Sequence, residues 1–137
     1  MTTPTEGLGR LREAEAAGRL DELAERHGLS LVVVFGSVAR GEPAPNDLDV
    51  AVGSRTGTLD PIAVITALMK LTGTDAVDLL DLDRAGPVAR QHALVPGEPL
   101  YEHPEGEFVR RQLQASGERL STEWMRRRDM ARMAELP

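Results

Sequence analysis

The stretch that decides the fold reads Phe35-Gly36-Ser37-Val38-Ala39-Arg40-Gly41 and resumes, after a short loop, at Asp47-Leu48-Asp49-Val50. It begins at the end of a dense apolar run, residues 31–35, whose β-branched side chains predict a strand buried on both faces. Residues 47–52 predict a second strand. The loop between the two strands is too short for a helical crossover, so we expect them to be antiparallel neighbours.

The second strand carries two carboxylates. Residues two apart in a strand point to the same face, so Asp47 and Asp49 lie side by side. Two like charges this close repel each other unless a cation lies between them. Mg²⁺ favours one or two carboxylates together with phosphate oxygens, and two such ions roughly 3.5–4 Å apart can clamp a phosphoryl or nucleotidyl transfer. The pair therefore predicts a metal site.

The turn after the first strand supplies groups suited to a phosphate. Gly36 lets the backbone approach an anion closely, and the short helical turn that follows directs N–H groups toward it. Ser37 adds a hydroxyl donor and Arg40 a charged one. We expect these three residues to bind the phosphates of a nucleotide beside the metal site.

A third carboxylate is normally needed to complete such a site, and the strand expected over residues 76–82 offers Asp78 and Asp81. These residues are three apart and so lie on opposite faces of the strand. Both faces are otherwise apolar, so periodicity does not choose between the two.

The rest of the chain predicts an α/β (α+β) fold: a small mixed β-sheet flanked by helices, with a C-terminal helical tail. Residues 7–27 have helical spacing, and Gly18 within them leaves open one helix or two. Asp60-Pro61 marks a helix start and Gly73 its end. We divide the chain into a domain over residues 1–104 and a helical extension over 105–137. The remaining expected elements are a helix over 61–71, a helix over 87–94, an edge strand over 99–101 and a long helix over 108–133.

The composition and charge of the chain exclude some classes of function. The net charge of −6 argues against a general nucleic-acid-binding module, because phosphate neutralisation needs a basic surface. Residues 1–104 hold 9 Lys+Arg and 16 Asp+Glu, whereas residues 105–137 hold 7 and 6. The absence of cysteine excludes disulfides and thiolate metal sites. No apolar stretch is long enough for a membrane span, and the N-terminus does not resemble a signal peptide, so we expect a cytoplasmic protein.

Gly36-Ser37, nine intervening residues and then Asp47-x-Asp49 resemble the signature of the DNA polymerase β-like nucleotidyltransferases. Three further features point to a smaller group within this superfamily. They are the small size of the chain, the later Val77-Asp78-Leu79-Leu80-Asp81 and the closing Leu100-Tyr101-Glu102. Together they are similar to the minimal nucleotidyltransferases (MNT), the antitoxins of HEPN/MNT toxin–antitoxin pairs. One departure is Asn46, where relatives usually carry serine; both residues form turns.

The resemblance implies a nucleotidyltransferase fold and a set of site residues. Asp47, Asp49 and, by its match to the family pattern, Asp78 would bind two Mg²⁺ ions, and Asp78 would accept the proton of the attacking hydroxyl. Gly36, Ser37 and Arg40 would bind ATP.

The resemblance also implies a reaction and a partner: transfer of AMP from ATP to a tyrosine of a HEPN-family ribonuclease toxin, which neutralises the toxin. Two alternatives stay open, an antitoxin that acts by binding alone and a nucleotidyltransferase with a small-molecule acceptor. Known enzymes of the latter type carry a further substrate-binding domain, for which this chain has little room.

Overall fold

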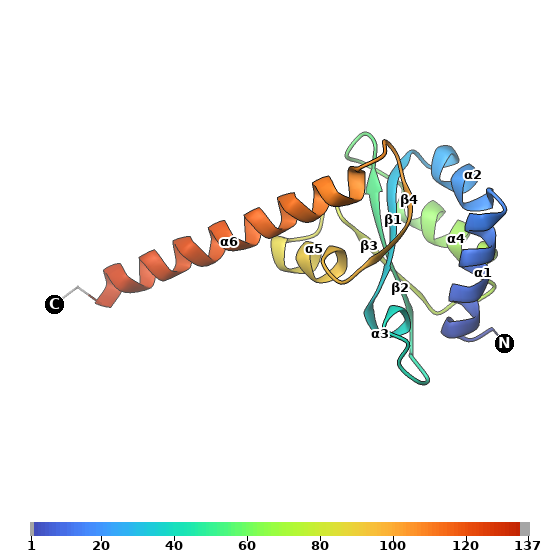
Figure 1. Cartoon of the computed structure of the whole chain (residues 1–137), viewed down its shortest axis with the longest axis horizontal. Helices are drawn as coiled ribbons and strands as arrows, with labels where there is room; N and C mark the ends of the chain where they lie inside the picture. The colour runs from blue at the N-terminus through green and yellow to red at the C-terminus, as the bar shows by residue number, and fades with distance from the viewer. Residues whose placement is uncertain (1, 135–137) are drawn as a thin grey trace.

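The computed structural model describes residues 2–134, and within the last helix it describes side chains beyond residue 117 only at Met125, Arg127 and Arg128. Helices and strands alternate along the chain as the sequence predicts for a mixed α/β fold (Figure 1). In chain order they are α1 (Pro4–Ala16), α2 (Arg19–Arg26), β1 (Leu29–Phe35), α3 (Gly36–Ala39), β2 (Leu48–Ser54), α4 (Pro61–Thr72), β3 (Val77–Asp81), α5 (Pro87–Leu94), β4 (Glu98–Glu102) and α6 (Glu107–Ala134).

The four strands form one mixed sheet in the order β3-β2-β1-β4. β1 pairs antiparallel with β2, which confirms the prediction from the short loop, and antiparallel with β4, which occupies an edge as expected. β2 and β3 are parallel, and α4 provides the crossover that parallel neighbours require. The amino ends of β2 and β3 therefore meet the carboxyl end of β1 at one end of the sheet.

The helix boundaries follow from capping residues. Asp60 caps α4, its side chain accepting a hydrogen bond of 3.2 Å from the backbone N–H of Ala63, and Gly73 ends the helix in the left-handed region. The N-terminal segment forms two helices and not one, which were the two possibilities that the sequence left open. Gly18 separates them and precedes α2 with a φ of +80°. α5 has the bounds predicted for it, and α6 confirms the predicted long helix.

The sheet buries both of its faces, because alternate strand residues point to opposite sides. One face packs against α1, α2 and α4, and the other is partly covered by α5 and the start of α6 (Figure 1). The strand residues in the first core are Val32, Val34, Leu48, Val50, Val52 and Val77. The second core is smaller and includes Leu31, Val33, Ala51 and Leu82 with Ala93, Leu94 and Ala115 of the two helices.

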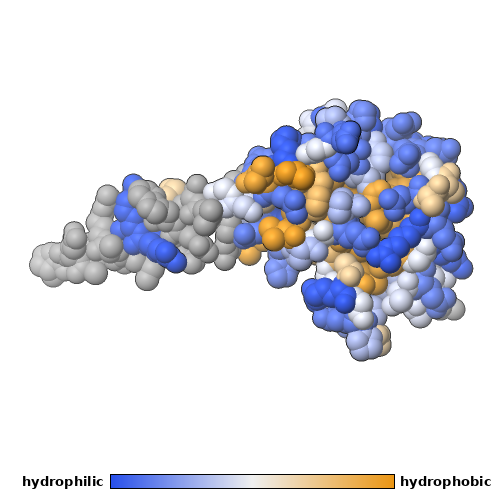
Figure 2. Space-filling model, in the orientation of Figure 1, coloured by the Kyte–Doolittle hydropathy of each residue, from blue (hydrophilic) through white to orange (hydrophobic). Residues whose placement is uncertain are grey.

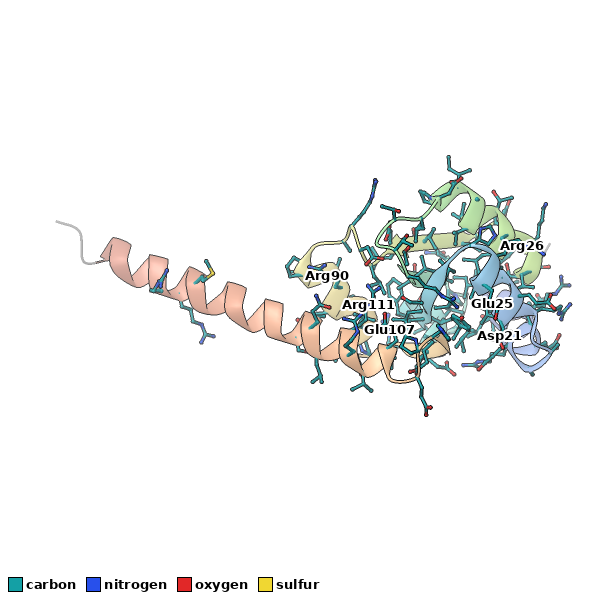
Figure 3. All side chains as sticks on the ribbon, turned by 90° about the horizontal axis from the view of Figure 1, so that it is seen from above. Asp21, Glu25, Arg26, Arg90, Glu107 and Arg111 are labelled. Atoms are coloured by element: carbon teal, nitrogen blue, oxygen red, sulfur yellow. The ribbon has the colours of Figure 1, made fainter. Side chains whose placement is uncertain are left out.

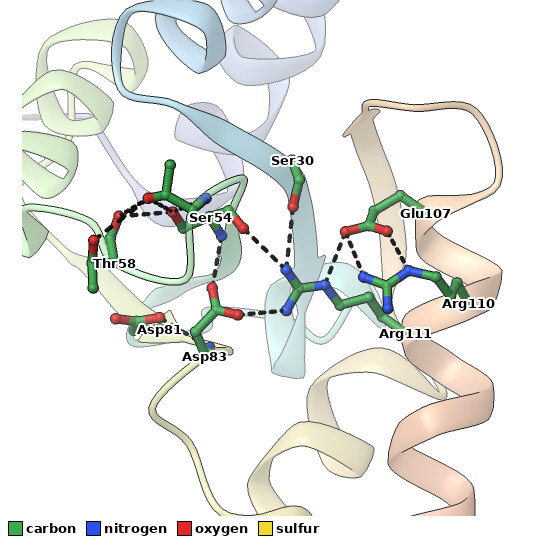
Figure 4. A network of polar contacts seen from close by, with 9 residues as sticks. Ser30, Ser54, Thr58, Asp81, Asp83, Glu107, Arg110 and Arg111 are labelled. Atoms are coloured by element: carbon green, nitrogen blue, oxygen red, sulfur yellow. Dashed lines mark hydrogen bonds and ion pairs between the residues drawn. The ribbon is translucent and has the colours of Figure 1, made fainter.

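A polar network fastens the start of α6 to the sheet, and Arg111 is its centre (Figures 3 and 4). The Arg111 guanidinium donates to Asp83 and Glu107, each at 3.1 Å, and to the hydroxyl of Ser30 at 3.3 Å. Hydrogen bonds from Arg110 and Arg111 lower the pKa of Glu107 to about 2, against the opposing effect of burial. The network therefore holds the poorly exposed Glu107 carboxylate in its ionised form.

Arg111→Ala is expected to destabilise the fold by about 3 kcal/mol, because it leaves the poorly exposed Asp83 without its ion-pair partner and removes one of the two arginines that bind Glu107. Glu107 stabilises the folded state above its ordinary pKa of 4.5, and that contribution is lost as the pH falls toward about 2. The penalty measured by urea unfolding should thus be smaller at pH 3 than at pH 7. Arg12→Ala, which breaks the half-exposed ion pair with Glu98, is the control and should change stability by less than about 1 kcal/mol.

Candidate active site

A pocket of about 800 Å³ opens on the part of the sheet that α5 and α6 leave uncovered. It lies where the carboxyl end of β1 meets the amino ends of β2 and β3, and its size falls in the range of ligand sites. The residues predicted from the sequence that line it are Gly36, Ser37, Arg40, Asp49 and Asp78.

Asp49 and Asp78 face each other across the parallel strands. They are register partners of β2 and β3, whereas Asp81 is the partner of Val52, further along the sheet and away from the pocket. The pairing answers the question that periodicity left open, because of the two β3 aspartates Asp78 is the one beside Asp49.

The charge on Asp49 is disfavoured in the folded protein. Burial, the negative charges of Asp78 and Asp47, and a hydrogen bond with the Asp78 side chain together raise the pKa of this carboxyl from 3.8 to about 6, and burial has the largest effect. The Arg40 guanidinium opposes these effects and lowers the pKa. A site that holds carboxylates together at this cost is typical of metal binding and catalysis.

Gly36 allows the turn to lie directly against Asp49. Its φ of +76° is in the left-handed region, which favours glycine, and a Cβ atom built there would collide with Asp49 Oδ2. Phe35, the residue before it, is the β1 register partner of Asp49. The glycine therefore brings the backbone of the Gly36-Ser37 turn and the Asp49 carboxylate into one wall of the pocket.

Arg40 follows the α3 turn and is the cation nearest to this site among the pocket-lining residues. Its Nε donates to Glu42 at 3.0 Å, and the side chain is about half exposed. The guanidinium thus remains accessible to an anion that enters the pocket beside Ser37.

Asp47 departs from the prediction. β2 begins at Leu48, so Asp47 belongs to the preceding loop, is exposed and does not line the pocket. Among the side chains that the structure describes, no group of three acidic or histidine residues lies close enough together to hold a metal ion. The paired carboxylates of Asp49 and Asp78 nevertheless fit Mg²⁺, which takes one or two carboxylates and completes its shell with water and substrate phosphate.

The sequence did not indicate the wall of the pocket opposite the Gly36-Ser37 turn. This wall comes from α5 and includes Val88 and His92, which are four residues apart and so share a helix face. His92 was interpreted as a surface histidine; it is exposed and also lines the pocket. The spacing between Val88 and His92 indicates that they share a helix face, but the sequence does not show that this face lies beside β3.

Asp49→Asn is expected to stabilise the metal-free protein by about 1–2 kcal/mol at pH 8. The pKa of Asp49 is raised on folding, so ionisation destabilises the folded state as the pH rises from about 4 through about 6, and asparagine does not ionise. The full shift corresponds to about 3 kcal/mol, which we reduce because the side chain is partly exposed. Urea unfolding should show the gain at pH 8 and none at pH 4. Equal stabilities at pH 8 would mean that folding does not raise the pKa of Asp49.

A mixed sheet that carries paired aspartates beside a glycine-serine turn defines the class of nucleotidyltransferases. A family model described as "Polymerase beta, Nucleotidyltransferase" matches residues 19–106, and the chain belongs to this family. This confirms the resemblance seen in the sequence motifs. No curated protein gives a significant match to the sequence.

Solved structures of toxin–antitoxin systems share the fold. A chain from a toxin–antitoxin crystal structure with AMP-PNP is 25% identical, with a TM-score of 0.66 over 84% of this chain and 95% of that chain. A chain from the MntA–HepT toxin–antitoxin is 22% identical, with a TM-score of 0.62 over 85% and 95%. A chain from the complex of tri-AMPylated Shewanella oneidensis HEPN toxin with MNT antitoxin is 22% identical, with a TM-score of 0.62 over 90% and 98%.

Proposed function

We propose that this protein is an MNT antitoxin that transfers AMP from ATP to a tyrosine of a HEPN-family ribonuclease toxin and so neutralises it. The observation that carries the proposal is the Asp49–Asp78 pair beside Gly36 in an open pocket of a nucleotidyltransferase-family chain. The structures with a similar fold support the choice of reaction, since one contains AMP-PNP and another an AMPylated HEPN toxin.

The site residues predicted from the sequence each have a role in this reaction. Asp49 and Asp78, with Asp47 from the adjacent loop, would hold two Mg²⁺ ions, which neutralise phosphate charge and orient the triphosphate when bound. The Gly36-Ser37 backbone and the Arg40 guanidinium bind the phosphates. The three aspartates alone would repel ATP, so the arginine and the turn also offset part of their negative charge.

The transfer itself is a displacement at the α-phosphorus. The tyrosine oxygen forms a bond to the α-phosphorus, the bond from that phosphorus to the bridging oxygen breaks, and pyrophosphate leaves. Asp78 accepts the phenolic proton as the new bond forms. Since Asp49 and Asp78 are register partners, the base lies beside the carboxylate that orients the nucleotide.

An open pocket and a reaction that uses ATP suit a protein partner and a cytoplasmic location. The pocket is open, as a site for a residue presented by another protein must be. No helix in residues 2–134 is long and apolar enough to cross a membrane. The reaction consumes ATP and the chain has no cysteine, as suits a reducing compartment, so we assign the protein to the cytoplasm.

The test is to incubate the protein with ATP, Mg²⁺ and the HEPN protein encoded beside it, and then to measure the intact mass of both. The proposal predicts that the HEPN protein gains the mass of one or more AMP groups, that a tyrosine carries them, and that EDTA prevents the gain. A HEPN protein that is bound and inhibited at unchanged mass would show neutralisation by binding alone and would overturn the enzymatic proposal.

A further inference from the structure

Large apolar side chains are exposed on α5 and on the first turns of α6. Val88 of α5 is 58% exposed, and Val109 and Leu113 of α6 are 55% and 70% exposed. Figure 2 shows hydrophobic surface gathered over α5 and the base of α6. We call these three residues and the area around them the α5–α6 surface. Its apolar side chains are not needed for packing, because Ala93, Leu94 and Ala115 form the buried contact between the helices and the sheet.

The α5–α6 surface adjoins the catalytic pocket at Val88. Val88 both belongs to this surface and lines the pocket, on the wall opposite the Gly36-Ser37 turn. A protein that rests on this surface is therefore next to the pocket that contains Asp78. A second copy of this chain seated on the same surface would instead lie across the mouth and hinder any acceptor, which favours the acceptor as the occupant.

The charge and position of α6 point to the chemistry of that partner. Residues 107–134 hold 7 arginines and 4 acidic residues, whereas residues 1–106 hold 9 Lys+Arg and 17 Asp+Glu. The family model ends at residue 106, before α6 begins. The whole helix is about 42 Å long, and the part beyond its contact with α5 and the sheet projects from the domain (Figure 1). A helix that projects with apolar side chains exposed gains stability when a partner covers it.

We propose that the acceptor protein docks on the α5–α6 surface through an apolar patch bordered by acidic side chains, and that this contact places its tyrosine over the pocket. The inference rests on the proposed function, since it identifies the surface that recruits the substrate of the same site. The docking surface is separate from the residues that bind nucleotide, so binding of the partner and the transfer of AMP can be impaired independently.

The experiment measures the affinity for the adjacent HEPN protein by calorimetry, without ATP, for the wild type and for Leu113→Glu and Val109→Glu. Both substitutions are at exposed positions, and circular dichroism checks that the fold is retained. The control is Ile62→Glu, a similar change at a side chain 75% exposed on α4, on the opposite face of the sheet. We expect each α6 variant to bind at least about tenfold more weakly, and the control to bind like the wild type.

Transfer kinetics separate this inference from the proposed function. The α6 variants should have a raised KM for the HEPN protein with a nearly unchanged kcat and unchanged affinity for ATP and Mg²⁺. Wild-type affinity in both α6 variants, or an equal loss in Ile62→Glu, would overturn the docking surface and leave the reaction standing. Tight binding of the HEPN protein without any transfer of AMP by the wild type would overturn the reaction, and failure of the wild type to bind it would overturn both.

Discussion

Asp49→Asn is expected to reduce the rate of AMP transfer at least about 10³-fold while the fold is retained. Asparagine has the shape of aspartate, but it lacks the negative charge with which Asp49 would hold a divalent cation next to the triphosphate. Loss of about 4 kcal/mol of transition-state stabilisation corresponds to this change in rate. The measurement is single-turnover transfer of labelled AMP to the HEPN protein, with both proteins above their dissociation constant.

The same variant provides its own check on folding, because metal-free Asp49→Asn is expected to be more stable than the wild type at pH 8. Removal of a catalytic carboxylate whose charge destabilises the fold should lower the activity and raise the stability together. Binding of the HEPN protein should be unaffected. If Asp49→Asn labels its partner at the wild-type rate, Asp49 does not belong to the catalytic centre.

The second large effect is a contrast between the two aspartates of β3. Asp78→Asn should also reduce transfer about 10³-fold, because it removes the register partner of Asp49 and the proposed acceptor of the tyrosine proton. Asp81→Asn should leave the rate within about threefold of the wild type. Its Oδ1 accepts a hydrogen bond of 3.0 Å from the backbone of Asp83, a role that an asparagine oxygen can also fill.

These two variants are matched in chemistry and in strand, so a general effect of losing a carboxylate from β3 would appear in both. The pH dependence adds a further distinction. Residual transfer by Asp78→Asn should increase with pH more steeply than that of the wild type, because hydroxide must then replace the missing base. Equal loss of activity in both variants would contradict the assignment of Asp78.

Much of this architecture could be predicted because local signals agree with the tertiary fold. The β-branched run before Gly36 became β1, and Asp60-Pro61 and Gly73 mark the ends of α4. The short loop after Arg40 also determined that the first two strands are antiparallel. In each case a steric or hydrogen-bonding rule acts within a few residues, so the rest of the chain is not needed to apply it.

The features that sequence alone left open depend on contacts between distant segments. Whether Asp78 or Asp81 faces Asp49 depends on the register of β3 against β2, which the crossover through α4 sets. Asp47 was wrongly included in the second strand. The alternation of side chains in the sequence extends back to Asp47, but the pairing of β2 with β3 begins only at Leu48. The α5 wall of the pocket was not predicted, because α5 reaches the pocket only through contacts between distant segments.

The central claim is that Asp49, Asp78 and the Gly36-Ser37 turn form one nucleotide and metal site. The most direct measurement is a crystal structure with Mn²⁺ and a non-hydrolysable ATP analogue, in which anomalous scattering locates the metal. We predict an anomalous peak bound by oxygens of Asp49 and Asp78, with the triphosphate lying against Gly36 and Ser37. A metal that binds without contact to either carboxylate, or a triphosphate held elsewhere on the protein, would contradict the claim.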